Sequence, residues 1–320
     1  MKIKKVIHVV SISGGKDSTV TMSIAINRVG KENCRFIYCD TGNEHPLVYL
    51  YIDYLEIRFG VKIDRLKNDF TARINAKRLF VSKDQRRGRD KKGRKMRWSN
   101  KHKRAAIVAL KPTGIPFLDL CLWKGRFPSR KAQFCTEQLK TILAVAYQSA
   151  LIDQGYNVIS WQGVRRDESD NRKNAKKAER ISLNLFAFRP LVSWSAADVF
   201  EYHATNGIEP NPLYKLGMSR VGCMPCINVN KQELREISSR FPEVIDRIAE
   251  WELLVGQASK RGYSTFKADK SDLQNRKEIF EKLCIRERVR WSKTSHGGRR
   301  YTLLSAMPSP ECSSSYGLCE

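Results

Sequence analysis

The sequence predicts an α/β protein built on a doubly wound parallel sheet. Short apolar runs that are typical of buried strands alternate with segments of helical periodicity. The first of these strands leads directly into a glycine-rich loop and then into a helix. With 320 residues, of which 41% are hydrophobic, the chain can form one large domain, or one domain with an appendage, around a substantial core.

The predicted elements follow one another in a regular order. Buried strands are expected at residues 6–11, 35–39, 62–66 and 158–162, and helices at residues 19–29, 47–59 and 136–151. Residues 190–202 have the pattern of a turn and a helix, with Ser195 as the N-cap and Asp198 three residues later, as in a capping box. The charged stretch 167–180 is expected to be mobile, and the chain after Cys226 is helical and polar in pattern to about Arg290.

The segment 83–104 interrupts this pattern. It holds twelve Lys or Arg residues, two glycines and almost no apolar residues, which predicts a loop or an exposed arm. One interpretation is a solvated insertion. The other is a nucleic-acid-binding arm in which Trp98 and His102 stack on bases.

Charge and cysteine content narrow the classes of function. The net charge of +26 favours a polyanionic partner, because self-repulsion of this size needs a compensating role. No run of 18 apolar residues predicts a membrane span, and the start of the chain does not resemble a signal peptide, so a cytoplasmic protein is expected. Nine cysteines in such a chain argue against structural disulfides and indicate a metal, a cluster or redox chemistry.

The glycine-rich loop has the composition of a phosphate-binding site. Adjacent glycines let successive backbone N–H groups point at one anion, and the following helix adds its positive N-terminal end. Lys16 can neutralise phosphate charge, Asp17 can help to hold Mg²⁺, and the serine hydroxyls can donate to phosphate oxygens. The predicted nucleotide-binding residues of this segment are Ser11, Ser13, Gly14, Gly15, Lys16, Asp17 and Ser18.

Several motifs in order resemble one known family. The loop is similar to the pyrophosphatase loop (PP-loop) of the N-type ATP pyrophosphatases, which cleave ATP to AMP and pyrophosphate and often adenylate a substrate. Residues 5–228 resemble one branch of these proteins, the phosphoadenosine phosphosulfate (PAPS) reductase-like superfamily. The motifs that resemble this branch are Asp40-Thr41-Gly42, Gly163-Val164-Arg165-Arg166-Asp167-Glu168-Ser169, Trp194-Ser195, Asp198-Val199, Pro212-Leu213-Tyr214 and Gly222-Cys223-Met224-Pro225-Cys226.

The resemblance implies a fold, a domain division and further ligands. It implies an adenine nucleotide alpha hydrolase-like fold, with a PP-loop ATP pyrophosphatase domain over residues 1–215 that carries the basic insertion 83–104. Residues 216–320 then form a helical C-terminal region with a cysteine cluster. The expected cofactors are ATP, Mg²⁺ and a [4Fe-4S] cluster. Asp40, Thr41, Gly42, Gly163, Arg165 and Arg166 join the predicted nucleotide-binding residues, with the two arginines on phosphate charge.

The cysteines leave two arrangements open. Cys223 and Cys226 have the spacing of a metal knuckle, and four thiolates are normally needed. In one arrangement Cys312 and Cys319 complete the site, and Cys135 is the reactive thiol near ATP. In the other, Cys135 is a ligand and a tail cysteine carries sulfur. Zn²⁺ is an alternative to the cluster, because tetrahedral Cys₄ zinc fits the same spacing.

The complete loop, together with the cysteine pair, resembles the DndC/SspD-type proteins of DNA phosphorothioation. Sulfonucleotide reductases carry a degenerate loop. The resemblance therefore implies an enzyme that adenylates a nucleic-acid acceptor, DNA rather than RNA, for sulfur supplied by a cysteine desulfurase or another donor. Lys16, Asp17 and Cys135 are the predicted catalytic residues, and a homodimer is compatible with the sequence. The alternatives are a PAPS reductase of sulfur assimilation and an ATP-regulated nucleic-acid-binding module.

Overall fold

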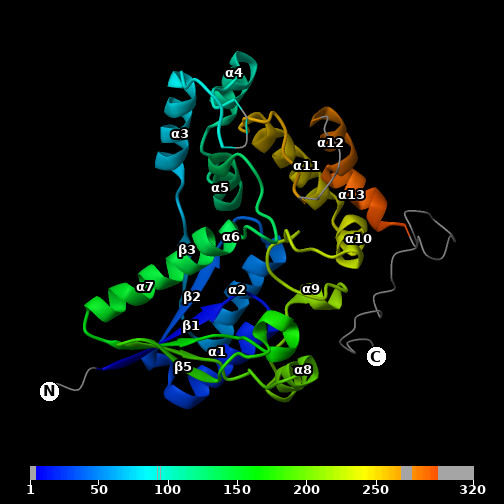
Figure 1. The fold of residues 1–320 in the computed structure, drawn as a ribbon. Helices are drawn as coiled ribbons and strands as arrows, with labels where there is room; N and C mark the ends of the chain where they lie inside the picture. Colours follow the sequence, from blue (N-terminus) through cyan, green and yellow to red (C-terminus); the bar gives the residue numbers. More distant parts are fainter. Residues whose placement is uncertain (1–4, 92, 94, 268–275, 295–320) are drawn as a thin grey trace.

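The centre of the molecule is a six-stranded sheet in the order β3-β2-β1-β4-β6-β5 (Figure 1). The computed structural model describes residues 5–294 except 92, 94 and 268–275. Neighbouring strands are parallel except β5 and β6, which pair antiparallel. The strands are β1 Val6–Ile12, β2 Cys34–Asp40, β3 Ile63–Lys67, β4 Asn157–Trp161, β5 Ala178–Ser182 and β6 Leu185–Phe188. The predicted fold class is confirmed, with an added antiparallel edge strand.

Helices cover both faces of the sheet. Alternate residues of a strand point to opposite faces, so Val9 packs toward α7 (Ile142–Asp153), whereas Val10 lies in the core shared with α1 (Lys16–Val29) and α2 (Pro46–Phe59). Both valines are fully buried. The parallel strands are thus covered on both sides, as their apolar sequences require.

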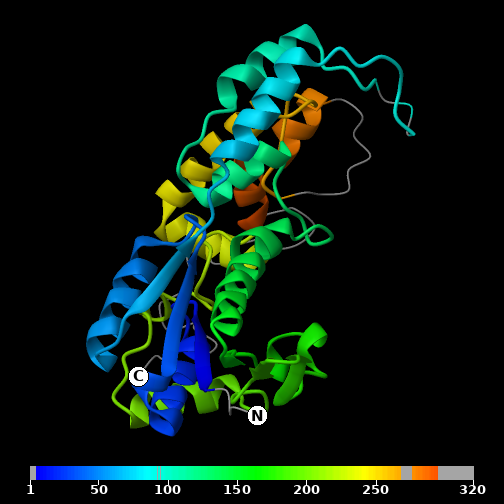
Figure 2. The ribbon, with the colours of Figure 1, turned by 90° about the vertical axis from the view of Figure 1, so that its left-hand side faces the viewer.

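A helical part stands above the sheet (Figures 1 and 2). α4 and α5 pack against α11, α3 packs against α4 and α5, and α10 and α13 pack against α11 and each other. The predicted C-terminal helical region is therefore completed by helices from the first half of the chain. The helices are α3 Thr71–Lys83, α4 Asn100–Ala109, α5 Pro116–Lys124, α10 Lys231–Arg240, α11 Pro242–Gln257, α12 Arg276–Leu283 and α13 Ile285–Ser292.

The remaining elements are short. They are η1 Lys31–Asn33, α6 Phe134–Thr136, η3 Arg166–Glu168, η4 Asp170–Arg172, α8 Ala196–Thr205 and α9 Pro212–Lys215, with a π-helical turn at Glu137–Thr141 between α6 and α7. Ser195 caps α8 and Asp198 closes the capping box, as predicted. In the described part of the chain, no helix is long and apolar enough to span a membrane.

The basic insertion is more ordered than predicted. Trp98 is only 6% exposed, so the prediction that it stacks on bases is wrong. The buried Asp84 carboxylate accepts from the Trp98 backbone N–H at 2.9 Å and from the Arg86 side chain, and this ties the two ends of the segment together. The last five residues of the segment belong to α4, and His102 lies against Gly262.

The charged stretch 167–180 also differs from the expectation of a mobile segment. It contains most of η3, all of η4 and the start of β5. β5 pairs with β6, and Arg189 holds Glu179 at 3.1 Å. The partner strand comes later in the chain, so composition alone did not reveal this hairpin.

Candidate active site

Most of the predicted site residues meet in a cleft of about 1170 Å³, whereas Gly14, Asp40, Gly42 and Arg166 do not line it. The loops after β1, β2 and β4 border this cleft, so it lies at the carboxyl ends of parallel strands, where α/β proteins bind ligands. The predicted residues that line it are Ser11, Ser13, Gly15, Lys16, Asp17, Ser18, Thr41, Cys135, Gly163, Arg165, Cys223 and Cys226.

The loop between β1 and α1 is built to leave a helix N-terminus open. Gly14 has a φ of +74°, and a Cβ there would meet Val48 Cγ1 at 2.8 Å, so only glycine fits. Ser18 Oγ accepts from the Ser13 N–H at 3.1 Å and donates to the Gly15 carbonyl at 2.9 Å. Gly15 then begins α1 as its N-cap. The loop therefore offers an anion the positive end of α1.

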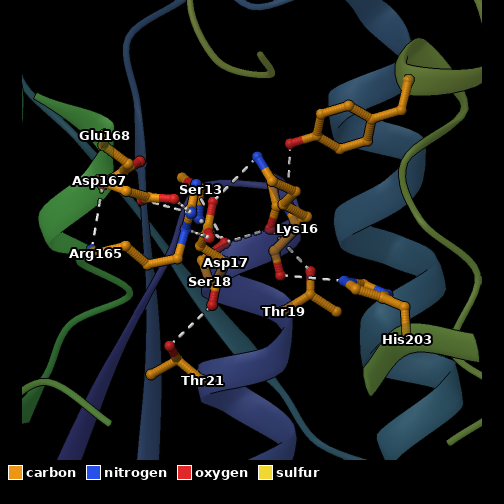
Figure 3. Close-up of polar contacts among 12 residues, drawn as sticks. Ser13, Lys16, Asp17, Ser18, Thr19, Thr21, Arg165, Asp167, Glu168 and His203 are labelled. Atoms are coloured by element: carbon orange, nitrogen blue, oxygen red, sulfur yellow. Dashed lines mark hydrogen bonds and ion pairs between the residues drawn. The ribbon is translucent and has the colours of Figure 1, made fainter. Parts of the chain in front are cut away.

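Lys16 lies at the base of the cleft. Its ammonium is 5.4 Å from the centre of the Tyr214 ring and 5.6 Å from that of Phe200. The Tyr214 hydroxyl also accepts from the Lys16 backbone N–H at 3.1 Å, and the Lys16 carbonyl lies 3.1 Å from His203 Nε2 (Figure 3). Burial lowers the pKa of Lys16. The residue is fixed from several elements before any ligand arrives.

Arg165 connects the loop after β4 to α1. It is 3% exposed, and its Nε donates to Asp17 Oδ1 at 2.5 Å (Figure 3). Its Nη1 donates to both carboxylate oxygens of Asp167, at 2.5 and 2.6 Å. Asp17 Oδ2 lies 3.5 Å from Lys16 Nζ. The side chains of Lys16, Asp17, Arg165 and Asp167 thus form one network of ion pairs beside the loop.

Gly163 makes this connection possible. A Cβ at this position would lie 2.9 Å from the carbonyl carbon and oxygen of Asp17. The β4 loop therefore approaches the backbone of α1 more closely than any other residue type allows. Arg166, by contrast, is exposed, donates to the Ala175 carbonyl at 3.0 Å and lies outside the cleft.

The Asp40-Thr41-Gly42 motif joins β2 to the cysteine segment. Asp40 Oδ1 accepts from the Gly42 N–H at 2.8 Å, and Thr41 Oγ1 donates to Glu44 Oε1 at 2.6 Å. The Cys223 thiol lies 3.4 Å from Thr41 Oγ1 and donates to Glu44 Oε1 at 3.6 Å. Of the three motif residues only Thr41 lines the cleft, and Asp40 and Gly42 shape the turn behind it.

Four cysteines, Cys39, Cys135, Cys223 and Cys226, line the cleft together with Lys140. Burial raises the pKa of Cys223 to about 12 and also raises that of Cys135. The charge of Cys223, and those of Glu44, Cys226 and Cys135, raise the pKa of Lys140. The Lys140 side chain is accessible and lines the cleft.

The described residues do not form a metal site by themselves. Within residues 5–294, apart from the gaps given above, no three His, Cys, Asp or Glu side chains are grouped so that they could hold a metal ion. The Cys223 thiol is instead engaged as a hydrogen-bond donor to Glu44. Cys312 and Cys319, the other two predicted ligands, lie outside the described residues.

Several cleft residues were not predicted. Glu44, Lys140, Arg172 and Arg220 line the cleft, and the two arginines pair with Glu168 and Glu233 respectively. Arg172 follows the Gly163–Ser169 motif by three positions and Glu44 follows Gly42 by two, so proximity to the motifs was the available signal. Lys140 and Arg220 lie in segments that no predicted nucleotide-binding motif covers.

Relatives show what the chain is similar to. A protein of Escherichia phage 186 named "Uncharacterized 37.8 kDa protein in gpa 5'region" is 42% identical over 328 positions, which cover 98% of this chain and 97% of that protein. Adenosine 5'-phosphosulfate reductase of Mycobacterium tuberculosis (strain ATCC 25177 / H37Ra) is 36% identical over 75 residues, 23% of this chain and 29% of that enzyme.

The chain is also similar to a solved structure and to a family model. The crystal structure of PAPS reductase from Candida auris in a phosphate complex aligns with a TM-score of 0.41 at 15% identity, over 68% of this chain and 82% of that one. Residues 7–229 match the model of the phosphoadenosine phosphosulfate reductase domain. Because this match spans more than half of the sequence, the chain belongs to the phosphoadenosine phosphosulfate reductase domain family.

Proposed function

We propose that this protein is a cytoplasmic ATP pyrophosphatase that adenylates a nucleic-acid acceptor, DNA in the first instance, for sulfur insertion of the phosphorothioation type. One observation carries the proposal: the glycine-rich loop between β1 and α1 and four cysteine thiols line the same cleft. A reductase acting on an already activated sulfate has no need of a loop that binds the phosphates leaving from ATP.

The described residues suit the first step. The N-terminus of α1 and the Lys16 ammonium would hold the β- and γ-phosphates, where charge develops as pyrophosphate leaves. Asp17 and Asp167, whose carboxylates both line the cleft, would hold Mg²⁺ that arrives with ATP. An acceptor oxygen attacks the α-phosphorus, the bond to the β-phosphate oxygen breaks, and the acceptor carries AMP.

The second step uses a thiol of the same cleft. A cysteine desulfurase would place a sulfane sulfur on Cys135. That sulfur attacks the adenylated centre, AMP leaves, and the acceptor is joined to Cys135 through a disulfide bond. An external dithiol then reduces this bond, which releases the sulfur on the acceptor and restores the thiol.

The proposed enzyme also holds a metal group. A [4Fe-4S] cluster on Cys223, Cys226, Cys312 and Cys319, or Zn²⁺ on the same ligands, would supply redox or structural chemistry beside the thiol. Iron, sulfide and zinc analysis of anaerobically purified protein decides between them. Protein that lacks all three under these conditions contradicts the cluster prediction.

The test of the proposal is product analysis with labelled ATP, with and without DNA or RNA. AMP and pyrophosphate are expected, with AMP release stimulated by nucleic acid and a sulfur donor. Lys16→Met should abolish turnover, whereas Lys215→Met, which removes an exposed lysine paired with Glu209, should leave it unchanged.

Other products select another function. Formation of ADP and phosphate contradicts the proposal. Conversion of PAPS to sulfite selects the reductase, the alternative that family membership favours. ATP binding without cleavage selects the regulated nucleic-acid-binding module.

A further inference from the structure

A row of exposed cations leads from the helical part to the cleft. Arg73 lies on α3, Lys124 is the last residue of α5, and Arg126 lies two positions after Lys124. All three side chains are exposed, and α3 and α5 lie side by side above α6 (Figures 1 and 2). We call these three residues the basic ridge.

Aromatic rings hold the ridge in place. Arg73 Cζ lies 4.7 Å from the centre of the Trp123 ring, and Lys124 Nζ lies 3.8 Å from it. Phe70 stacks beside the same ring, with centres 6.0 Å apart and planes at 25°. Arg126 Cζ lies 5.4 Å from the Phe134 ring. Cations held over aromatic faces keep their charge and are restricted in position.

The ridge carries uncompensated charge. In the described part of the chain none of its three cations is within ion-pair distance of a carboxylate, whereas Lys282, Arg286 and Arg290 on α12 and α13 are each paired with one. Arg130 and Lys131, also exposed, extend the positive surface along the same loop. An unpaired row of this kind suits a polyanion.

The ridge ends at the cleft. Arg73 Nη1 donates to Gln138 Oε1 at 2.8 Å, and Gln138 belongs to the π-helical turn that carries Lys140. Phe134, which underlies Arg126, lies between Gln133 and Cys135, and both of these line the cleft. A strand bound along the ridge therefore has a direct path to the thiols and the phosphate-binding loop.

We infer that the basic ridge binds the phosphate backbone of the DNA acceptor and directs it into the cleft. This inference rests on the nucleic-acid acceptor of the proposed function. The ridge binds phosphates rather than bases, because the Trp123 ring already packs against Arg73, Lys124 and Phe70. Trp98 is buried and therefore cannot stack on a base either. Binding without base stacking should be independent of sequence and strongly salt-dependent.

The test is DNA affinity as a function of salt. For Arg73→Gln/Lys124→Gln/Arg126→Gln we expect affinity at about 100 mM salt to fall at least roughly tenfold, with a salt slope shallower by about 2 to 3 units. The matched control is Lys282→Gln/Arg286→Gln/Arg290→Gln, which removes the same charge from exposed positions and should bind like the wild type. Arg73→Lys/Lys124→Arg/Arg126→Lys should also retain binding.

Binding experiments with abasic DNA and with RNA distinguish phosphate binding from base stacking and DNA from RNA. An abasic strand of equal length should bind as tightly as normal DNA, because its phosphates are intact. Weaker binding of the abasic strand by more than about tenfold indicates base stacking and overturns the inference. An unchanged salt slope in the triple Gln variant overturns it as well, and binding of RNA but not of DNA overturns the assignment to DNA.

The inference and the proposed function fail separately. Circular dichroism and nucleotide binding confirm that the triple variant is folded. If the wild type binds DNA through the ridge but releases no pyrophosphate, the proposed function is wrong and the inference that the ridge binds DNA is supported. If the wild type cleaves ATP to AMP and pyrophosphate with DNA present while the triple variant binds DNA normally, the inference about the ridge is wrong and the proposed function is supported.

Discussion

Arg165 Nε lies 2.5 Å from Asp17 Oδ1, so the loop after β4 is fastened to the first turn of α1 through a buried ion pair. The two residues are 148 positions apart in the sequence. Each belongs to a separate motif, and their contact places both motifs at the same cleft. The same guanidinium also holds Asp167, so its loss exposes two carboxylates to each other.

Arg165→Met should destabilise the protein substantially. Removing one partner of a buried ion pair leaves uncompensated charge, and we expect the free energy of unfolding to fall by about 3 kcal/mol. Urea denaturation measures this. Arg166→Met is the control, because Arg166 is exposed and should change stability by less than about 0.5 kcal/mol. Equal effects of the two substitutions would contradict a structural role for the Arg165 pair.

Gly163→Ala should separate the β4 loop from α1. The new Cβ would lie 2.9 Å from backbone atoms of Asp17, which cannot rotate away as a side chain could. We expect a loss of about 1 to 3 kcal/mol in the free energy of unfolding, together with weaker ATP binding. Gly15→Ala is the stability control, because its Cβ would meet its nearest neighbour at 3.4 Å. A fully stable Gly163→Ala variant would show that the close approach is not required.

Glu252 should make stability depend on pH. Burial raises its pKa to about 7, although the backbone N–H groups of Phe266 and Ile285 donate to it. The folded state therefore holds the proton more tightly than the unfolded state. The stabilising contribution of protonated Glu252 to the free energy of unfolding is fully present below the unfolded pKa near 4.5. It is lost as pH rises through about 7.

The measurement for Glu252 is urea denaturation at acidic and neutral-to-basic pH. The Glu252→Gln variant cannot titrate at this position. Relative to it, the free energy of unfolding of the wild type should fall by about 3 kcal/mol between a pH below 4.5 and a pH above 7. If the two proteins show the same pH dependence, the carboxyl group has an ordinary pKa in the folded state.

Cys223 should react slowly with alkylating agents in metal-free protein. Its pKa of about 12 leaves little thiolate near pH 8. We expect iodoacetamide to modify it roughly three orders of magnitude more slowly than a free cysteine of pKa about 8.5. Mass spectrometry of digested protein gives the rate for each cysteine. Rapid modification of Cys223 would show that a nearby cation, such as Lys140, stabilises its thiolate.

Much of the fold follows from local sequence. The β1 strand, the glycine-rich loop and α1 were predicted because their apolar periodicity and their glycines act within a few residues of one another. The same holds for the Ser195–Asp198 capping box. The family motifs also indicated which segments meet. That the glycine-rich loop binds phosphate stays a prediction.

The position of Lys140 depends on the helix type. On an ideal α-helix, residues five apart are separated by about 140°, so Lys140 would face away from Cys135. The π-helical turn at Glu137–Thr141 widens the helix and brings such residues onto one side. Local propensity does not predict such a turn, so the sequence pattern gave no sign that Lys140 joins the thiols.

The sequence by itself determined the fold class, the glycine-rich loop between β1 and α1 and the motifs that belong together, because periodicity, glycine placement and charge act locally. Only the tertiary structure decided that Trp98 is buried, that Arg165 pairs with Asp17 and that β5 runs antiparallel. These features depend on partners far along the chain, whose distance and orientation are set when the core packs. The identity of a residue determines the chemistry of its side chain, and the packing of the core determines which other groups that side chain contacts.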